Sequence, residues 1–330
     1  MMRMCGWMGL AAVVALGGCG DDAATSTGDA GPDGGAAQGG GEPPSELALG
    51  TFNTGLVAVV KGVDDRRPLI EQAIADSPLD VLCLQELFSP IVSADFAESL
   101  SDTFPHSHHS ALGDAAVGNG LLILSRYPLD NTQALLFEAA DPSGLTDRMV
   151  IAADVVLGDA RLHVMCSHLV AGLDADSAML RADEIDEVAA FAQAQGYLEG
   201  PSVLLGDFNM GPDPVGSCTD ASDPPCLAPD EAGYAKMLET FDDAAADLGA
   251  CTQCRDAFLP LQVLTSYVDE PDQRIDHCFT RELGAWSATG AQVIFDEAIA
   301  VELTASDGSV EVLTTLSDHF GVRCDLAYVP

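Results

Sequence analysis

Short apolar runs that end in polar residues recur along this chain, and they predict a protein built largely from buried strands. The runs are rich in Val, Ile and Leu, which is typical of strands in the interior of a sheet. The nine runs cover residues 47–53, 80–86, 120–128, 148–157, 161–168, 202–209, 273–280, 291–296 and 319–329.

Three stretches between these runs show the 3.6-residue spacing of amphipathic helices instead. They cover residues 64–77, 174–194 and 231–247. Because helices are interspersed with many strands, we expect an α/β protein. The predicted arrangement is a layered sandwich with helices outside and two sheets inside.

The composition narrows the possible functions. Apolar residues make up 48% of the 330 residues, which excludes a wholly disordered chain and a bare coiled coil. Acidic residues outnumber basic ones by 52 to 13, and the only lysines are Lys61 and Lys236. Proteins that bind a phosphate backbone do so mainly through Lys and Arg. The charge therefore argues against a polynucleotide partner.

The N-terminal residues predict export. Arg3 precedes an apolar run, Trp7 to Leu16, that is too short to span a bilayer as a stable helix. Leu16-Gly17-Gly18-Cys19 resembles a bacterial lipobox, so we expect a lipoprotein signal peptide at 1–18 and a lipid on Cys19. The alternative is an ordinary signal peptide that is cleaved nearby. Both readings predict an exported protein, either a lipoprotein of the cell envelope or a secreted one.

Residues 19–46 are rich in Gly, Ala, Asp and Pro and show no hydrophobic period. Such a segment is expected to be a disordered tether that holds the following domain about 30 Å from the anchor. The predicted domain then covers residues 47–330.

The cysteines fit an oxidising compartment. Cys218 with Cys226, and Cys251 with Cys254, are expected to form local disulfides because they lie in loop-like sequence. The remaining four domain cysteines lie in apolar runs. They are either buried thiols or, for Cys278 and Cys324, a pair across strands.

Polar side chains with catalytic potential end most of the predicted strands. Asp207 and Asn209 follow the run at 202–206, and the period of two places them on the same side. His277, on the opposite face of its strand from Asp276, is expected to be structural. The full set comprises Asn53, Glu86, His168, Asp207, Asn209, Asp276, Asp318 and His319. Purely structural strand ends favour turn formers such as Gly and Pro.

These residues stand in the ordered motifs FN, LQE, SH, GDFN, RIDH and SDH. In this order they resemble the endonuclease/exonuclease/phosphatase superfamily, which includes pancreatic-type deoxyribonucleases, inositol phosphatases and neutral sphingomyelinases. The resemblance extends from about residue 47 to residue 328. It implies a DNase I-like four-layer α/β/β/α sandwich with its active site at one rim. It also implies a catalytic divalent metal, Mg²⁺ or Mn²⁺.

The same resemblance, together with the chemistry of the side chains, implies the metal ligands. Glu86 is expected to hold the ion, because Mg²⁺ prefers one or two carboxylates and keeps several waters. Asn53 and Asp318 are expected nearby as auxiliary ligands, directly or through water.

The remaining residues are assigned to the reaction itself. His168 and Asn209 are expected to supply hydrogen-bond donors to the charged transition state. His319 is expected to act as the base or as an electrophilic imidazole, oriented by Asp276. Asp207 is expected to position or deprotonate the attacking water, so the choice of base between Asp207 and His319 stays open.

The substrate is the least determined part of the prediction. Residues 53–56 and 118–129 resemble neutral sphingomyelinases and bacterial phospholipases C, and the signatures of inositol phosphatases are missing. A phosphodiesterase that acts on phospholipid headgroups is therefore favoured. An extracellular nuclease is the alternative, and a catalytically inactive surface lipoprotein is a hypothesis of another class. No protein partner is implied.

Overall fold

The computed structural model describes residues 41–88, 90–139, 144–212, 230–262, 272–304 and 310–330. Two six-stranded mixed sheets form the centre of this part of the chain. The first sheet has the order β11 (Trp286–Ile294), β14 (Gly321–Tyr328), β1 (Glu46–Asn53), β2 (Val81–Gln85), β4 (Leu122–Ser125) and β3 (His106–His108). The second has the order β5 (Leu129–Leu136), β6 (Met149–Leu157), β7 (Ala160–His168), β8 (Ser202–Asp207), β10 (Asp276–Arg281) and β9 (Asp242–Asp243). Each of the nine predicted apolar runs overlaps one of these strands, although β11 begins five residues before its run.

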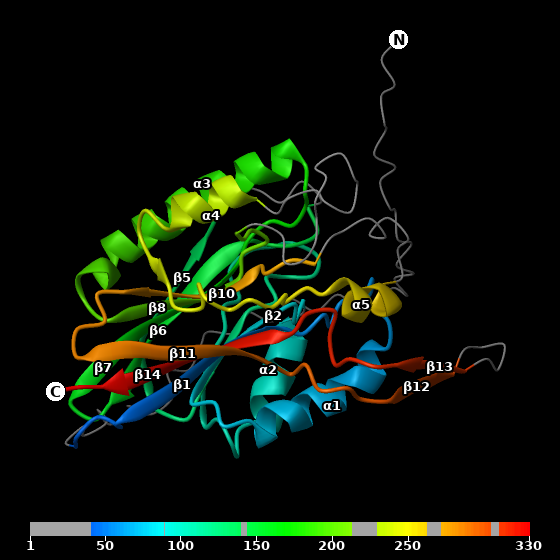
Figure 1. Cartoon of the computed structure of the whole chain (residues 1–330), viewed down its shortest axis with the longest axis horizontal. Coiled ribbons are helices and arrows are strands. Elements are labelled where there is room, and N and C mark those ends of the chain that lie inside the picture. Colours follow the sequence, from blue (N-terminus) through cyan, green and yellow to red (C-terminus); the bar gives the residue numbers. More distant parts are fainter. Residues whose placement is uncertain (1–40, 89, 140–143, 213–229, 263–271, 305–309) are drawn as a thin grey trace, which may run out of the picture. The chain divides into compact units, whose positions relative to one another are not determined.

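Helices cover the outer face of each sheet (Figure 1). The covering helices are α1 (Val63–Asp76) and α2 (Pro90–Ser99) on the first sheet and α3 (Ala175–Ala194) and α4 (Glu231–Met237) on the second. The short α5 (Arg255–Phe258) lies at one end of the sandwich (Figure 1), and 3-10 turns occur at Tyr197–Glu199 and Leu259–Leu261. None of the helices in the described segments is long and apolar enough to cross a membrane.

Three hydrophobic clusters separate four layers. Leu49 and Ile123 of the first sheet pack between the sheets with Val164 of the second. A second cluster joins the outer face of β6, β7 and β8 to α3 and α4, and a third joins the first sheet to α1 and α2. Neighbouring residues of one strand face different clusters, as the period of two requires. The predicted α/β/β/α sandwich is confirmed.

The helix predicted at 231–247 is shorter than expected. It ends at Met237, and the chain then forms β9, which pairs with β10 through Asp243 and Phe279. Phe241 and Ala245 become buried in this arrangement. Burial of these side chains against the sheet therefore outweighs the local preference for a longer helix.

A hairpin of β12 (Val301–Thr304) and β13 (Val310–Leu313) was not predicted. Its Val301 and Leu313 side chains pack with Val60 and Leu261 in a small hydrophobic cluster, while Val310 and Val312 remain exposed. Its four-residue strands are too short to stand out in the sequence.

Three disulfides lie within the described residues: Cys83–Cys166, Cys251–Cys254 and Cys278–Cys324. The predicted Cys251–Cys254 pair is confirmed, and Cys278 pairs with Cys324 across the two sheets. Cys83 and Cys166 are also bonded to each other. The predicted pair of Cys218 and Cys226 lies outside the described residues.

The ordered contacts of the domain reach back to Gly41, ahead of the predicted boundary at residue 47. The Gly41 carbonyl accepts a hydrogen bond from the Asp159 amide at 3.0 Å, and the Ser45 carbonyl accepts one from the Tyr328 amide at 2.9 Å. Cys19 lies outside the described residues.

A buried polar network supports β10 from outside the predicted site. The Asp243 carboxylate accepts a hydrogen bond from Arg274 Nη1 at 2.8 Å and lies 3.3 Å from His277 Nδ1. His277 Nε2 is 2.9 Å from the Met210 carbonyl oxygen, so both ring nitrogens have structural partners, as expected for this residue. Burial by itself raises the pKa of Asp243, but His277 and then Arg274 outweigh it and hold that pKa well below its usual range.

We expect Asp243→Asn to lower the free energy of unfolding at pH 7 by about 3–5 kcal/mol, because it leaves Arg274 without its buried counter-ion. Since the folded-state pKa of Asp243 is depressed, its stabilisation is present above the unfolded pKa and is lost as pH falls. The variant should therefore lose less stability than the wild type between pH 5 and pH 3. Urea unfolding at several pH values measures both effects. Asp242→Asn, at the exposed neighbouring position, is the control and should change little.

Candidate active site

The polar strand ends of both sheets meet at one edge of the sandwich. Asn53 ends β1 and Glu86 follows β2 in the first sheet, while His168 ends β7 and Asp207 ends β8 in the second. Each of these two strand pairs is parallel, so their carboxyl ends lie together. Asp276 opens the antiparallel strand β10 directly opposite Asp207. The structure thus brings together residues that are up to 223 positions apart in the chain.

Asp207 lies at the centre of the group. Its Oδ2 accepts a hydrogen bond from Asn53 Nδ2 at 2.9 Å and lies 3.4 Å from His168 Nε2 and 3.9 Å from His319 Nε2. Burial and then the charge of Asp276 raise the pKa of Asp207 to about 6, although His319 and Asn53 oppose the shift. A buried carboxylate whose pKa is raised to about 6 is well placed to exchange a proton near neutral pH.

His319 and Asp276 form the predicted pair. The Nδ1 atom of His319 lies 2.9 Å from Asp276 Oδ2, which fixes the ring and leaves Nε2 directed toward Asp207. Burial alone lowers the pKa of His319, but the carboxylates of Asp276 and Asp207 together raise it well above its usual value. This is the arrangement of a carboxylate-oriented catalytic imidazole.

Glu86 follows β2 in a left-handed conformation with φ of 60°. Burial and then the charge of Asp318 raise the pKa of Glu86 to about 7, while the charge of His319 lowers it. Residues other than glycine rarely adopt positive φ, and such strain concentrates at functional sites. The chain therefore holds a carboxylate beside other carboxylates at a strained position.

Asp318 is held by two neighbours. Its Oδ2 accepts a hydrogen bond from Gln262 Nε2 at 2.7 Å, and Ser317 Oγ lies 3.1 Å from its Oδ1. Gly55, with φ of 55°, packs directly against this carboxylate, where a Cβ would collide with Oδ1. Glycine at position 55 is thus required by both its conformation and the space available.

His168 is buried beside Asp207. Burial, followed by the charges of Arg148 and His319, lowers the pKa of His168 well below its usual value, so its ring is neutral at physiological pH. Its Nδ1 has no hydrogen-bond partner among the described residues. A neutral imidazole has a single N–H, and Nε2, the nitrogen that faces Asp207 and the other site residues, is the one suited to donate to a phosphate oxygen.

Asn209 departs from the sequence prediction. The strand ends at Asp207 and does not continue to Asn209, which has a φ of 50°. The backbone N–H of Asn209 donates to Asp207 Oδ1 at 3.0 Å, and its side-chain Nδ2 donates to the Leu169 carbonyl at 3.0 Å. The period of two therefore does not apply at this position, although the turn keeps Asn209 next to the site.

Three further residues that contact the candidate site or its loops were not predicted. Arg66 is fully buried and donates to the carbonyls of Thr54 at 3.0 Å and Leu316 at 2.7 Å, so it joins the loops that follow Asn53 and precede Asp318. Gln262 contacts Asp318, and Gln253 Nε2 lies 3.4 Å from His319 Nε2. No motif marks these residues, because their partners are distant in sequence.

The donor set fits a divalent cation. Buried carboxylates are costly unless they are paired or bind metal, and the buried Asp207, Asp276 and Asp318 converge here with the partly buried Glu86. Arg66 is a buried cation close enough to interact with the charges of Asp318 and Glu86. Asp276 Oδ1 is buried without a hydrogen-bond partner in the described part of the chain. One potential ligand atom from each of Asp207, Asp276 and His319 lies within 4.8 Å of the others. This group is distinct from the predicted set of Asn53, Glu86 and Asp318.

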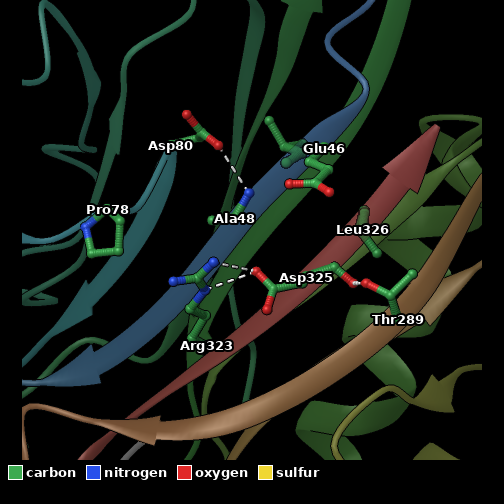
Figure 2. A pocket seen from close by; sticks show the side chains of 9 residues that line it. Glu46, Ala48, Pro78, Asp80, Thr289, Arg323, Asp325 and Leu326 are labelled. Carbon is green, nitrogen blue, oxygen red and sulfur yellow. Dashed lines mark hydrogen bonds and ion pairs between the residues drawn. The ribbon is translucent and has the colours of Figure 1, made fainter.

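A pocket of about 410 Å³ lies elsewhere, at the opposite ends of β1 and β14 (Figure 2). Three of its charged groups have partners within the chain: Arg323 pairs with Asp325 at 2.7 Å, and Asp80 accepts a hydrogen bond from the Ala48 amide at 2.9 Å. It does not contribute to the catalytic group.

Comparison with known proteins gives one match by sequence and many by structure. A model of the endonuclease/exonuclease/phosphatase family matches residues 50–319. No curated protein sequence matches the chain significantly.

Among solved structures, SmcL is 18% identical, with a TM-score of 0.69 and coverage of 86% of this chain and 99% of its own. Sphingomyelinase C from Streptomyces griseocarneus is 20% identical, with a TM-score of 0.62 and coverage of 85% and 99%. D. rerio TDP2 complexed with a single-strand DNA product is 17% identical, with a TM-score of 0.58 and coverage of 86% and 99%. At these identities the likeness shows the shared fold.

Proposed function

Since the chain belongs to the endonuclease/exonuclease/phosphatase family, a family of phosphoester hydrolases, we propose that it is a metal-dependent phosphodiesterase that acts on phospholipid headgroups outside the cytoplasm. The observation that carries the proposal is the convergence of four carboxylates and two imidazoles from both sheets. A simple structural role does not require so many titratable groups in one buried place.

Glu86, with Asn53 and Asp318 beside it, is proposed to hold Mg²⁺ or Mn²⁺. When bound, such an ion neutralises charge on a phosphate oxygen. Asn53 is proposed to act through a water molecule, because its Oδ1 already accepts the Gly55 amide at 3.0 Å and its NH₂ group donates to Asp207 Oδ2 at 2.9 Å.

His319 is proposed to take the proton from the attacking water through Nε2, while Asp276 holds Nδ1. Asp207 faces the same space from the second sheet and is the alternative base. His168 contributes a neutral imidazole to the phosphate, and Asn209 keeps a second amide proton available beside it.

The basic residues favour a small headgroup over a polynucleotide. Arg66, Arg148, Arg181 and Arg274 are buried, so they are not available to a long ligand at the surface. Arg66 donates to backbone carbonyls, and Arg181 and Arg274 pair with Asp230 and Asp243. A third of the basic residues in the domain are therefore buried inside the protein.

Five bases that are exposed or partly exposed are paired as well. Lys61, Arg67, Arg161, Lys236 and Arg323 each form an ion pair with an acidic residue of the same chain. Binding of a phosphate backbone needs several free cations along a groove. A zwitterionic phosphocholine headgroup carries its own positive charge, so its binding requires fewer cationic side chains from the protein.

The proposal is tested by incubating the purified domain with Mg²⁺ and four substrates in parallel: sphingomyelin vesicles, phosphatidylcholine vesicles, plasmid DNA and inositol phosphates. We expect release of phosphocholine from a choline lipid at a rate well above that for the other substrates. Preferential cleavage of plasmid DNA would replace the lipid assignment with a nuclease. No turnover of any substrate would favour the inactive binding lipoprotein.

We also propose that residues 1–18 are a signal peptide, that residues 19–46 form a tether and that Cys19 carries a lipid. Wild-type protein should then fractionate with membranes and incorporate labelled fatty acid, while Cys19→Ser should incorporate none. A soluble, unlabelled wild-type protein would remove the anchor without affecting the enzymology.

A further inference from the structure

The catalytic group depends on the spacing between the two sheets. Asn53 of the first sheet contacts Asp207 of the second at 2.9 Å, and His319 contacts Asp276 across the same gap at 2.9 Å. Facing sheets normally pack about 10 Å apart. Cross-sheet hydrogen bonds of this kind therefore require the strands to approach each other closely at the catalytic edge.

A disulfide joins the two sheets next to this edge. Cys83 of β2 and Cys166 of β7 are bonded to each other, and their Cα atoms lie only 5.5 Å apart. Cys83 is three residues before Glu86, and Cys166 is two residues before His168. The bond thus connects the two strands that carry a proposed metal ligand and a proposed phosphate contact.

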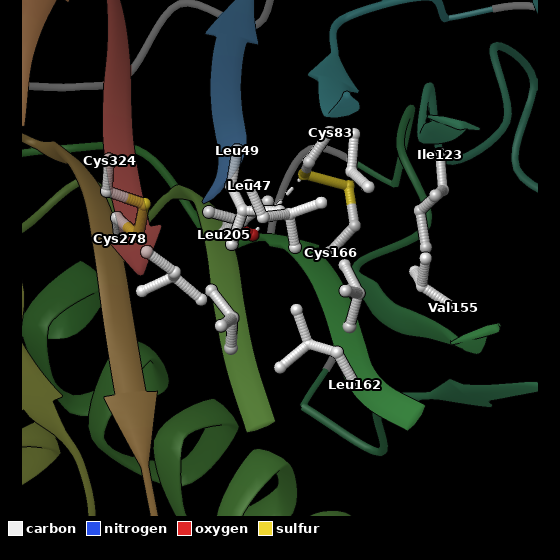
Figure 3. Close-up of a cluster of buried hydrophobic side chains, with 14 of the residues drawn as sticks. Leu47, Leu49, Cys83, Ile123, Val155, Leu162, Cys166, Leu205, Cys278 and Cys324 are labelled. Atoms are coloured by element: carbon white, nitrogen blue, oxygen red, sulfur yellow. Dashed lines mark hydrogen bonds between the residues drawn. A yellow bond between two sulfur atoms is a disulfide. The ribbon is translucent and has the colours of Figure 1, made fainter. Parts of the chain in front are cut away.

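The surroundings transmit any change at this bond to the site. Gln85 Nε2 lies 2.8 Å from Cys83 Sγ and 3.0 Å from Thr51 Oγ1, directly beside Glu86. The disulfide lies in the dry cluster between the sheets, with Leu47, Leu49 and Leu205 beside it (Figure 3). Protein interiors are close-packed, so two unbonded sulfur atoms at van der Waals separation would push these strands apart.

We propose that the Cys83–Cys166 disulfide is a positioning element for catalysis, which sets the separation of Glu86 and His168 and makes the hydrolase competent only after oxidative folding. The inference rests on the proposed function for the identity of the reaction. Both cysteines are fully buried, so the bond has to form before the core closes. The device is therefore a maturation step that confines activity to the oxidising compartment.

The chemistry of this step is thiol–disulfide exchange. The thiolate of one cysteine attacks a disulfide oxidant, such as oxidised glutathione, and releases one thiol. The second cysteine then attacks the mixed disulfide and releases the other. The protein loses two electrons and two protons, and the oxidant gains them as two thiols.

The test compares two pairs of cysteines that share the same core. Cys83→Ala/Cys166→Ala removes the proposed positioning bond, and Cys83→Val/Cys166→Ala removes it while filling more of the lost volume. Cys278→Ala/Cys324→Ala is the matched comparison, because that disulfide also joins the sheets, with Cα atoms 6.5 Å apart, but lies two residues from Asp276 and does not adjoin the proposed metal ligand Glu86 or His168. Mn²⁺ affinity by calorimetry, turnover and thermal unfolding are measured for each.

We expect the Cys83/Cys166 variants to fold but to bind Mn²⁺ about 10–100-fold more weakly, the loss typical of disturbed support around a metal site, with a matching loss of turnover. The Cys278/Cys324 variant should keep wild-type Mn²⁺ affinity. Wild-type affinity and turnover in a folded Cys83/Cys166 variant would overturn the inference. So would failure of both variants to fold, because the bond would then serve the fold alone.

The oxidised wild type separates this inference from the proposed function. If it hydrolyses none of the four substrates, the proposed function fails. The Mn²⁺ affinities of the variants still decide whether the disulfide positions the site.

Discussion

Glu86→Gln is expected to lower turnover by a factor on the order of 10³ while leaving the fold intact. Removal of metal by EDTA should abolish the wild-type activity, and Mg²⁺ should restore it. Stabilisation of phosphate charge by a bound ion is worth several kcal/mol, and each 1.4 kcal/mol corresponds to about a factor of ten in rate. Glutamine has nearly the same shape as glutamate, so the loss reports the charge and not the packing.

The Glu86 prediction is checked by initial rates across a Mg²⁺ titration, with calorimetry for Mn²⁺ binding. Glu98→Gln is the matched control, because Glu98 is an exposed carboxylate on α2. Full turnover by metal-free protein would contradict the metal-dependent mechanism. If Glu86→Gln bound Mn²⁺ with unchanged affinity, the metal site would be reassigned to the group of Asp207, Asp276 and His319.

His319→Ala is expected to lower turnover by about 10²–10⁴, the usual contribution of a general base. Asp276→Asn should change turnover in the same direction, because it disturbs the orientation of the ring through the 2.9 Å contact. The wild-type rate should also fall toward low pH. Although burial opposes it, the carboxylates of Asp276 and Asp207 hold the pKa of His319 above its usual value, and an imidazolium cannot accept a proton.

The base is identified by comparing His319→Ala with Asp207→Asn over a range of pH. Near wild-type turnover in His319→Ala, together with an inactive Asp207→Asn, would assign the base to Asp207. His319 would then be a phosphate contact. If both variants kept full activity, the phosphodiesterase proposal would fail.

The sequence predicted the strands well because a buried strand has a local signature. Runs such as 148–157 and 202–206 are apolar apart from Arg148, Asp154 and Ser202, so the local preference for a strand agrees with the tertiary packing. The helix at 231–247 was predicted too long because the burial of Phe241 depends on β10, which lies far along the chain.

The site was predicted in part for the same reason. Asn53, His168 and Asp207 end apolar runs, so their position at a sheet edge could be anticipated. The contact of Asp318 with Gln262 could not, because no local pattern indicates which amide a carboxylate will meet. The bond between Cys83 and Cys166 depends likewise on which strands face each other, and sequence alone does not determine disulfide connectivity.

The docking of Gly41 and Ser45 has a consequence for the direction in which the enzyme works. Strand β1 enters at Glu46 and reaches the catalytic edge at Asn53, so about 23 Å of strand separates the two ends. The leader attaches at the end of the sandwich remote from the catalytic residues. If Cys19 carries a lipid as proposed, the anchor joins the domain at the end away from the catalytic edge, and the reach of the flexible tether, about 30 Å, has to bring that edge round to any substrate in the same bilayer.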